Sequence, residues 1–311
     1  MKLSSLIEQI KLKKSYLCVG IDPDLEKIPK HIVNQKDPIY TFSKLIIDST
    51  VQFAVAFKFN VAFFEAYGID GLVSMEKLIK YVKKQYPNVF TIADAKRGDI
   101  GNSSSRYAKA FFEKFGFDSI TVSPYMGRDS IEPFLSFENR HTIVLALTSN
   151  SGAMDFQFIS SEGKKVYEHV IVKSKKWDGN EKIMYVVGAT KASHLEKIRK
   201  LIPDSFLLIP GVGKQGGSLE EVSTLGLNKN IGILVNSSRA IIYASNKGDF
   251  AEKAAAEAKN LQVRMELILK DKQIIWNLKP PQSKIKYLQR RGNQTINQTL
   301  KCIDSRKNKW S

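Results

Sequence analysis

The chain has 311 residues and a net charge of +17, a length that fits one large α/β barrel or two ordinary domains. With 43% hydrophobic and 25% charged residues it can bury a sizeable core, which excludes a generically disordered chain. No run approaches 18 apolar residues, residues 1–15 lack the hydrophobic stretch of a signal peptide, and two cysteines are too few for a disulfide scaffold. We therefore expect a soluble, reduced, cytoplasmic protein without a membrane-embedded part.

From Tyr16 onward, short apolar runs alternate with longer amphipathic segments. The short runs predict eight strands, at 16–22, 53–60, 89–95, 119–123, 142–147, 183–188, 206–210 and 231–236. Apolar residues spaced by threes and fours predict helices between them, as over 72–86 and 195–202, and Asp249 is the predicted N-cap of a last helix. Eight such units predict a (β/α)8 TIM barrel. A doubly wound open sheet is the alternative, but the turn after the first strand lacks a dinucleotide-binding glycine fingerprint.

The segment 271–311 differs in composition from the rest of the chain. It holds ten Lys or Arg against two Asp, a charge of +8, and it contains no Ala, Val or Glu. Pro280 and Pro281 would break any helix running through it. We predict a barrel domain over 1–270 and a basic appendage over 271–311. A nucleic-acid arm is the alternative to a solubilising or adventitious tail, but no zinc-finger spacing or RNA-recognition signature accompanies it, so we expect no nucleic-acid partner.

Charged residues lie at the predicted carboxyl ends of the first three strands, where barrels place their active sites. Asp22 ends strand one, Lys58 lies near the end of strand two, Asp94 and Lys96 end strand three, and Asp99 follows in the loop. Strand alternation predicts that positions 94 and 96 both face the barrel axis. An ordinary ion pair is the alternative, but burying several charges is costly unless they are paired and needed. A lysine between carboxylates stays protonated and suits protonation of a carbanion without metal or cofactor.

A second constellation lies at strands seven and eight. The glycine-rich run 210–217 can bring backbone N–H groups close to an anion, and 236–239 places amides, hydroxyls and the Arg239 guanidinium at a predicted helix start. Barrels frequently bind phosphate at this pair of loops, so the sequence predicts a phosphorylated substrate. The turn 148–152 offers further hydroxyl and amide groups. The four histidines fall in no common motif, which disfavours a histidine metal site or a Ser-His-Asp triad.

Five segments resemble, in order, the orotidine 5′-phosphate decarboxylases, and in particular the longer bacterial subfamily with DAKRGDIG on strand three. They are LCVGIDPD at 17–24, FKFN at 57–60, DAKRGDIG at 94–101, PGVGKQGG at 210–217 and NSSR at 236–239. The resemblance covers roughly residues 5–268. One departure is Ser151, where the subfamily generally has proline.

The resemblance implies a homodimeric carboxy-lyase without metal or cofactor. It would convert orotidine 5′-monophosphate to uridine 5′-monophosphate (UMP) and CO₂, the last step of de novo UMP synthesis. For catalysis it implies Lys96 as proton donor to pyrimidine C6, Asp94 beside the substrate carboxylate and Lys58 as the bridge to the ribose. It also implies that Asp99 reaches into the site of a second subunit.

The same resemblance implies a set of substrate-binding residues. They are Asp22 on a ribose hydroxyl, Ile100 and Ser103 beside Asp99, Ser149 at the pyrimidine, Gln215 between pyrimidine and phosphate, and Pro210, Ser238 and Arg239 at the phosphate side. A magnesium-dependent sugar-phosphate decarboxylase or aldolase relative is the alternative enzyme. Gln215, the turn at 148–150 and the DAKRGDIG segment argue against it.

Overall fold

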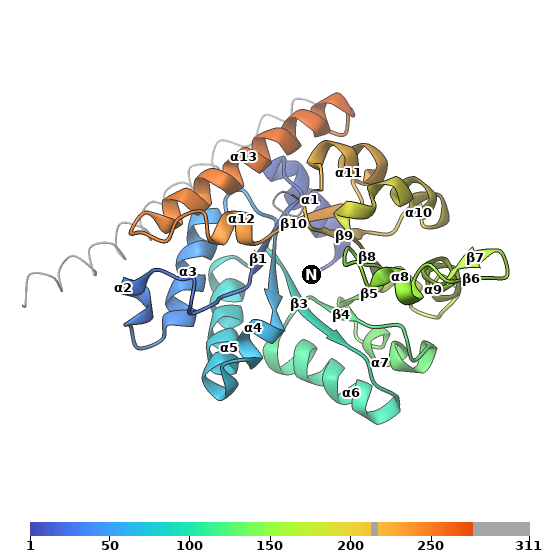
Figure 1. The fold of residues 1–311 in the computed structure, drawn as a ribbon, viewed down its shortest axis with the longest axis horizontal. Helices are drawn as coiled ribbons and strands as arrows, with labels where there is room; N and C mark the ends of the chain where they lie inside the picture. The colour runs from blue at the N-terminus through green and yellow to red at the C-terminus, as the bar shows by residue number, and fades with distance from the viewer. Residues whose placement is uncertain (213–216, 276–311) are drawn as a thin grey trace, which may run out of the picture.

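The computed structural model describes residues 1–212 and 217–275. Eight parallel strands form a closed barrel, in which each strand pairs with the next along the chain and the last pairs with the first (Figure 1). The strands are β1 (Leu17–Ile21), β2 (Ala56–Asn60), β3 (Phe90–Arg97), β4 (Ser119–Val122), β5 (His141–Leu147), β8 (Ile183–Val187), β9 (Leu207–Pro210) and β10 (Ile233–Ser237). The predicted (β/α)8 barrel is confirmed.

Helices surround the barrel and cover the outer face of the sheet (Figure 1). They are α1 (Leu3–Lys13), α2 (Lys30–Val33), α3 (Pro38–Thr50), α4 (Val61–Glu65), α5 (Gly68–Gln85), α6 (Gly101–Lys109), α7 (Glu132–Leu135), α8 (Ala153–Phe156), α9 (Val166–Ser174), α10 (Leu195–Leu201), α11 (Leu219–Gly226), α12 (Arg239–Ile242) and α13 (Phe250–Asp271). A π-helical turn, Ala110–Phe115, extends α6, and 3₁₀ turns occur at Arg128–Ser130, Asn180–Lys182 and Ala189–His194. A short antiparallel hairpin, β6 (Ser160–Ser161) and β7 (Lys164–Lys165), stands outside the barrel.

The strands are continuous apolar runs because both faces of a parallel barrel are covered. In β1, β4, β8 and β10 every residue is buried. The first and last units meet where α13 packs along α3 and β1 (Figure 1). There the Phe42 ring stacks on Phe250 and on Tyr243, with centroids 5.3 and 5.9 Å apart. This aromatic contact joins the first and the last strand–helix units of the barrel.

Two local predictions need correction, and one element was not predicted. Strand two begins at Ala56 rather than Phe53, because the N–H groups of Phe53 and Ala54 both donate to the Thr50 carbonyl and continue the helical turn. Asp249 occupies the N-cap position of α13, but its carboxylate accepts a hydrogen bond from Ser245 instead of capping a backbone N–H. The β6–β7 hairpin was not expected.

The chain continues to pack on the barrel just beyond α13. Ile274 contacts the core and Ile275 is 7% exposed. Residues 276–311 lie outside the described part of the chain, so the division into a barrel and a basic appendage stays a prediction. Among the helices described, none is long and apolar enough to cross a membrane.

Candidate active site

Asp22, Lys58, Asp94 and Lys96 form one ionic network at the carboxyl ends of β1, β2 and β3. Lys58 Nζ lies 2.7 Å from Asp94 Oδ2 and 3.9 Å from Asp22 Oδ1. Lys96 Nζ lies 2.7 Å from Asp94 Oδ1. The Asp94 carboxylate therefore holds one lysine on each of its two oxygens. The structure brings together the four charged residues that the strand ends predicted.

The two lysines of this network differ in their exposure to solvent. Lys58 is 4% exposed because it leaves the middle of β2, opposite Gly20 of β1 and Ile92 of β3. The Lys96 side chain is 53% exposed at the end of β3. Lys58 is thus a fixed internal cation, whereas Lys96 presents its ammonium group at the open end of the barrel.

The charges of the network hold one another in the ionised state. Burial works to lower the pKa of Lys58, but the Asp94 and Asp22 carboxylates outweigh it and raise the pKa above its usual value. Burial likewise works to raise the pKa of Asp94, but Lys58 and Lys96 hold it well below the usual range. Lys58 and Asp94 therefore stay charged across the neutral pH range.

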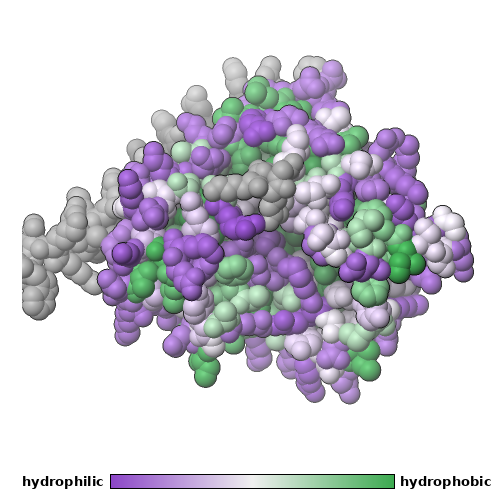
Figure 2. Space-filling view, viewed as in Figure 1, coloured by the Kyte–Doolittle hydropathy of each residue, from purple (hydrophilic) through white to green (hydrophobic). Residues whose placement is uncertain are grey.

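A cavity of about 300 Å³ leads from this network to the phosphate side predicted at strands seven and eight. It is lined from the β1 and β2 side by Asp22, Lys58, Asn60 and Phe63 and from the β9 and β10 side by Pro210, Ser238 and Arg239, while Asp94 and Lys96 are not among its lining residues. Figure 2 shows hydrophilic residues around the hollow at the centre of this face. Of the glycine-rich run 210–217 predicted for the phosphate side, residues 213–216, including Gln215, lie outside the described residues.

Polar groups beside this cavity have unused hydrogen-bonding capacity. Asp22 Oδ1 and Asn236 Oδ1 are buried without a hydrogen-bond partner in the described chain. The Arg239 guanidinium has no hydrogen bond or ion pair with any described residue, and Arg239 is exposed. The backbone comes close at Gly20, where a Cβ atom would lie 1.7 Å from Ser238 Oγ, so this position requires glycine. These groups are free to bind a polar, anionic ligand.

The predicted residues of the strand-three loop stand apart from the network. Asp99 Oδ1 accepts a hydrogen bond from the Ile100 N–H at 2.7 Å and makes no ion pair with a described residue. Ile100 is 57% exposed, and Ser103 is exposed at the start of α6. The buried Ser104 fixes the loop by donating to the Asp99 carbonyl at 2.9 Å. Within one chain, this loop does not complete the site.

Ser149 lies at the end of β5 in a turn that its neighbours hold. Gln157 accepts from the Thr148 N–H and donates to the Thr148 hydroxyl, both at 2.8 Å. At the end of β8, a Cβ on Gly188 would lie 2.7 Å from Ser149 Cβ. Gly188 and Gln157, which the sequence reasoning missed, therefore position Ser149. The turn forms with serine at position 151.

Sequence reasoning also missed Asn60 and Thr121. Asn60 was part of the FKFN motif, pairs with Asp94 in register, and lines the cavity. The Thr121 hydroxyl donates to Asp94 Oδ1 at 3.0 Å. Strand alternation could have found it, because Ser119, Thr121 and Ser123 form a polar face on a strand next to strand three.

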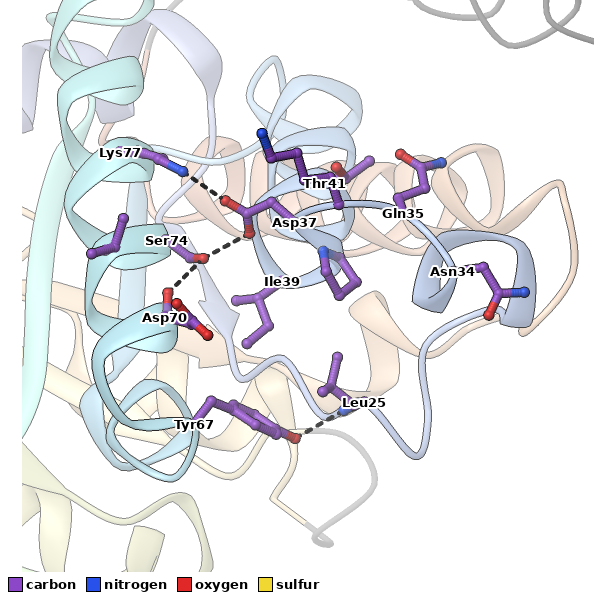
Figure 3. A pocket seen from close by; sticks show the side chains of 13 residues that line it. Leu25, Asn34, Gln35, Asp37, Ile39, Thr41, Tyr67, Asp70, Ser74 and Lys77 are labelled. Atoms are coloured by element: carbon purple, nitrogen blue, oxygen red, sulfur yellow. Dashed lines mark hydrogen bonds and ion pairs between the residues drawn. The ribbon is translucent and has the colours of Figure 1, made fainter.

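A larger cavity of about 1160 Å³ lies between α3 and α5, away from the charged network (Figure 3). Its polar side chains bond one another. Asp37 accepts from Ser74 at 2.7 Å and pairs with Lys77 at 3.0 Å, while the Tyr67 hydroxyl accepts from the Leu25 N–H at 3.0 Å (Figure 3). None of the predicted site residues lines this cavity.

In the described ranges, no group of three or more His, Cys, Asp or Glu side chains is arranged to hold a metal ion. The absence of a metal from the reaction remains a prediction, which a chelator can test.

Comparison with known proteins agrees with these features. Residues 15–254 match the model of the orotidine 5′-phosphate decarboxylase / HUMPS family. The orotidine 5′-phosphate decarboxylase of Flavobacterium johnsoniae is 60% identical over 272 residues, covering 88% of this chain and 100% of that protein. The Porphyromonas gingivalis enzyme of the same name is 53% identical, covering 88% and 100%. The solved OMP decarboxylase of Leishmania donovani superposes with a TM-score of 0.73 at 32% identity, covering 86% and 99%.

Proposed function

The chain belongs to the orotidine 5′-phosphate decarboxylase / HUMPS family, and we propose that the network of Asp22, Lys58, Asp94 and Lys96 is its catalytic centre. Its reaction is the decarboxylation of orotidine 5′-monophosphate to UMP and CO₂, the last step of UMP synthesis. The observation that carries the proposal is the Asp94 carboxylate, which holds Lys58 and Lys96 at 2.7 Å each.

The chemical step needs one proton and a place for one electron pair. When the bond between pyrimidine C6 and the carboxylate breaks, CO₂ leaves and the electron pair stays on C6. The Lys96 ammonium then gives its proton to C6 and becomes a neutral amine, which regains a proton from water. Asp94 holds this ammonium in place, and the cation also stabilises the developing carbanion.

The remaining cavity residues fit the rest of the nucleotide. Asp22 and Lys58 line the cavity from the β1 and β2 side, where ribose hydroxyls would meet a carboxylate and an ammonium group. Arg239, Ser238 and Pro210 line it from the β9 and β10 side, and a guanidinium without a partner among the described residues suits a phosphate dianion. We assign Ser149 to the pyrimidine because of its position beside β8. Gln215 is assigned to the link between pyrimidine and phosphate on the basis of its sequence motif alone.

We further propose a homodimer in which Asp99 completes the site of a second copy. The Asp99 carboxylate has no ion-pair partner among the described residues of its own chain. Exposed apolar side chains occur on this loop and on the 123–126 loop: Ile100 is 57% exposed, Tyr125 87% and Met126 44%. The 123–126 loop lies against the strand-three loop, since a Cβ on Gly98 would contact Met126 at 3.6 Å. Such a patch is typical of a protein interface.

Mixing two inactive variants tests the shared site. Lys96→Ala and Asp99→Ala each leave no intact site in their own homodimers. After the two are refolded together, half the dimers of a random mixture are mixed and each has one intact site, so roughly a quarter of all sites should recover. Loss of absorbance of the orotidylate chromophore measures the activity. No recovery in heterodimers confirmed by mass spectrometry would show that Asp99 serves its own chain.

The same assay tests the metal-free reaction. Dialysis against EDTA should leave turnover unchanged, because Lys96 supplies the proton and Arg239 the positive charge for the phosphate. Activity that EDTA removes and magnesium restores would instead support the sugar-phosphate chemistry of the alternative enzyme.

We also propose that the protein works in the cytoplasm. A reduced compartment suits Cys18, a buried free thiol whose pKa burial raises to about 12. Cell fractionation followed by immunoblotting tests the location.

We propose in addition that residues 1–270 form the catalytic domain and that 271–311 are not a nucleic-acid arm. Salt-sensitive binding of DNA or RNA that disappears on truncation of this segment would show that it is a nucleic-acid arm.

A further inference from the structure

Lys96 has a backbone conformation that a strand residue rarely adopts. Its φ is 48°, in the left-handed region, and among the described non-glycine residues it is the one such residue inside a barrel strand. For a residue with a side chain this conformation costs about 1–2 kcal/mol. It persists only where surrounding contacts hold it, so the contacts at this turn matter for the proposed proton donor.

The turn at Lys96 is part of a bulge that faces Thr121. Ala93 of β3 pairs with Ile120 of β4, and Arg97 pairs with Val122, so three residues of β3 stand opposite Thr121 alone. Thr121 is 1% exposed. Strand alternation alone therefore does not explain how Asp94 and Lys96 meet, because the strand is irregular between them.

The Thr121 hydroxyl bonds both ends of this irregular turn. It accepts a hydrogen bond from the Lys96 N–H at 2.9 Å and donates one to Asp94 Oδ1 at 3.0 Å. The same Oδ1 accepts from Lys96 Nζ at 2.7 Å. A hydroxyl has a single hydrogen, so its direction is fixed by the carboxylate. The result is a closed ring that joins the Lys96 backbone to its own ammonium group.

We propose that Thr121 is the positioning residue of the proton donor. Its hydroxyl holds the left-handed turn that sends the Lys96 side chain back over Asp94, and it orients the oxygen that receives the ammonium group. This inference rests on the role proposed above for Lys96. Thr121 is 1% exposed and its hydroxyl bonds Lys96 and Asp94, so it acts through these two residues rather than by contact with the nucleotide. A misplaced catalytic group lowers the rate of the chemical step more than it weakens binding.

A packing role for Thr121 predicts the opposite result from a positioning role. Valine keeps the volume of threonine and removes the hydroxyl, whereas serine keeps the hydroxyl and removes a methyl group. If Thr121 only fills space, serine is the more damaging substitution because it leaves a cavity. If the hydroxyl holds Lys96, valine is the more damaging one because it leaves the Lys96 N–H unpaired.

Steady-state kinetics with orotidine 5′-monophosphate separate these roles. We expect Thr121→Val to lower kcat by about 10- to 100-fold while KM changes by less than about threefold. We expect Thr121→Ser to stay within about threefold of the unmodified protein in both constants. A Thr121→Val variant with unchanged kcat would overturn the proposal. A kcat of Thr121→Ser below that of Thr121→Val would overturn it as well.

Thr142→Val is the matched control. Thr142 lies on β5 beside Ile120, is fully buried, and its hydroxyl has no hydrogen-bond partner among the described residues. Removing that hydroxyl should leave kcat unchanged, and an equal loss in this control would overturn the assignment to Thr121. If Thr121→Val fails to fold, Thr121→Cys replaces it. Its weakly hydrogen-bonding thiol should give a kcat below that of Thr121→Ser, and an equal or higher kcat contradicts the proposal.

Lys96→Ala, measured beside these variants, separates the two levels of the account. If Lys96→Ala turns over normally, the proton does not come from Lys96 and the proposed function of this residue fails. If Lys96→Ala is inactive while Thr121→Val is fully active, only the positioning role fails.

Discussion

The barrel carries a buried ionic cluster at each end, and the two clusters are built differently. At the carboxyl end, Asp94 holds two lysines, but Asp22 Oδ1 has no hydrogen-bond partner among the described residues. At the amino end, Asp118 is 2% exposed and accepts from the Thr91 N–H at 2.9 Å and the Thr91 hydroxyl at 2.8 Å. It also pairs with Lys83 and with the Met1 nitrogen.

The difference shows which end is built to bind a ligand. The Asp118 carboxylate is saturated by its own chain and lies beside neither described cavity. The Arg239 guanidinium and the Oδ1 atoms of Asp22 and Asn236 have no hydrogen-bond partner among the described residues, and all three residues line a cavity. A buried charge whose hydrogen bonds are all made within the protein supports a stable and unique structure. A buried charge without such partners costs folding free energy unless a substrate supplies them. The predictions below test this division, beginning with the largest effect.

Arg239→Ala should weaken substrate binding strongly and leave the fold intact. A charge-assisted hydrogen bond to a phosphate contributes about 1.5–3 kcal/mol, so KM should rise about 10- to 100-fold. The melting temperature should not fall, because the Arg239 guanidinium bonds no described residue. Steady-state kinetics with orotidine 5′-monophosphate and thermal unfolding measure the two effects. A lower melting temperature with unchanged KM would mean that Arg239 stabilises the fold and does not bind the substrate.

Acid should destabilise the protein partly through the amino end. Burial lowers the pKa of His141, so the folded protein takes up this proton less readily than the unfolded chain. Stability is therefore complete above the unfolded pKa of about 6.5 and is lost as pH falls toward the lower folded value, at no more than about 1.4 kcal/mol per pH unit for one group. Burial lowers the pKa of His194 in the same direction.

Urea unfolding between pH 5 and 8 measures this loss. His141→Gln should flatten the pH dependence, and the control His31→Gln, at an exposed histidine of α2, should leave it unchanged. If the slope survives His141→Gln unaltered, the acid sensitivity does not arise at the amino end.

Truncation after Ile275 should have the smallest effect. Ile275 is 7% exposed and its N–H bonds the Leu269 carbonyl, so a cut after this residue keeps the packed end of α13. We expect unchanged kcat and a free energy of unfolding within about 0.5 kcal/mol. An inactive truncated protein would mean that the basic segment supports the ionic cluster at the carboxyl end or at the amino end of the barrel.

Strand positions were predictable because each strand is a buried apolar run closed by a turn or a charged residue. The members of the charged network were predictable for the same reason: Asp22, Lys58 and Asp94 each interrupt such a run at its carboxyl end. Contacts between side chains were not. That Asp94 binds both lysines, one on each oxygen, depends on the register of β2 with β3.

The bulge at Lys96 shows where sequence reasoning ends. Lysine has no preference for a left-handed backbone, and the hydrogen bond that holds it comes from Thr121, 25 residues along the chain. Likewise, the requirement for glycine at Gly188 arises from Ser149 on another strand. Such features depend on non-local contacts that leave no local pattern. The roles of Asp99 and Gln215 stay predictions.

Two variants measured with two readouts test the division most directly. For Lys96→Ala, kcat should fall by at least about 1000-fold while the free energy of unfolding changes by less than about 1 kcal/mol, because this side chain is 53% exposed. For Asp118→Asn, the free energy of unfolding should fall by about 3 kcal/mol while the folded protein keeps its kcat within about threefold. An active Lys96→Ala, or a folded but inactive Asp118→Asn, would contradict the assignment of catalysis to the carboxyl end and stability to the amino end.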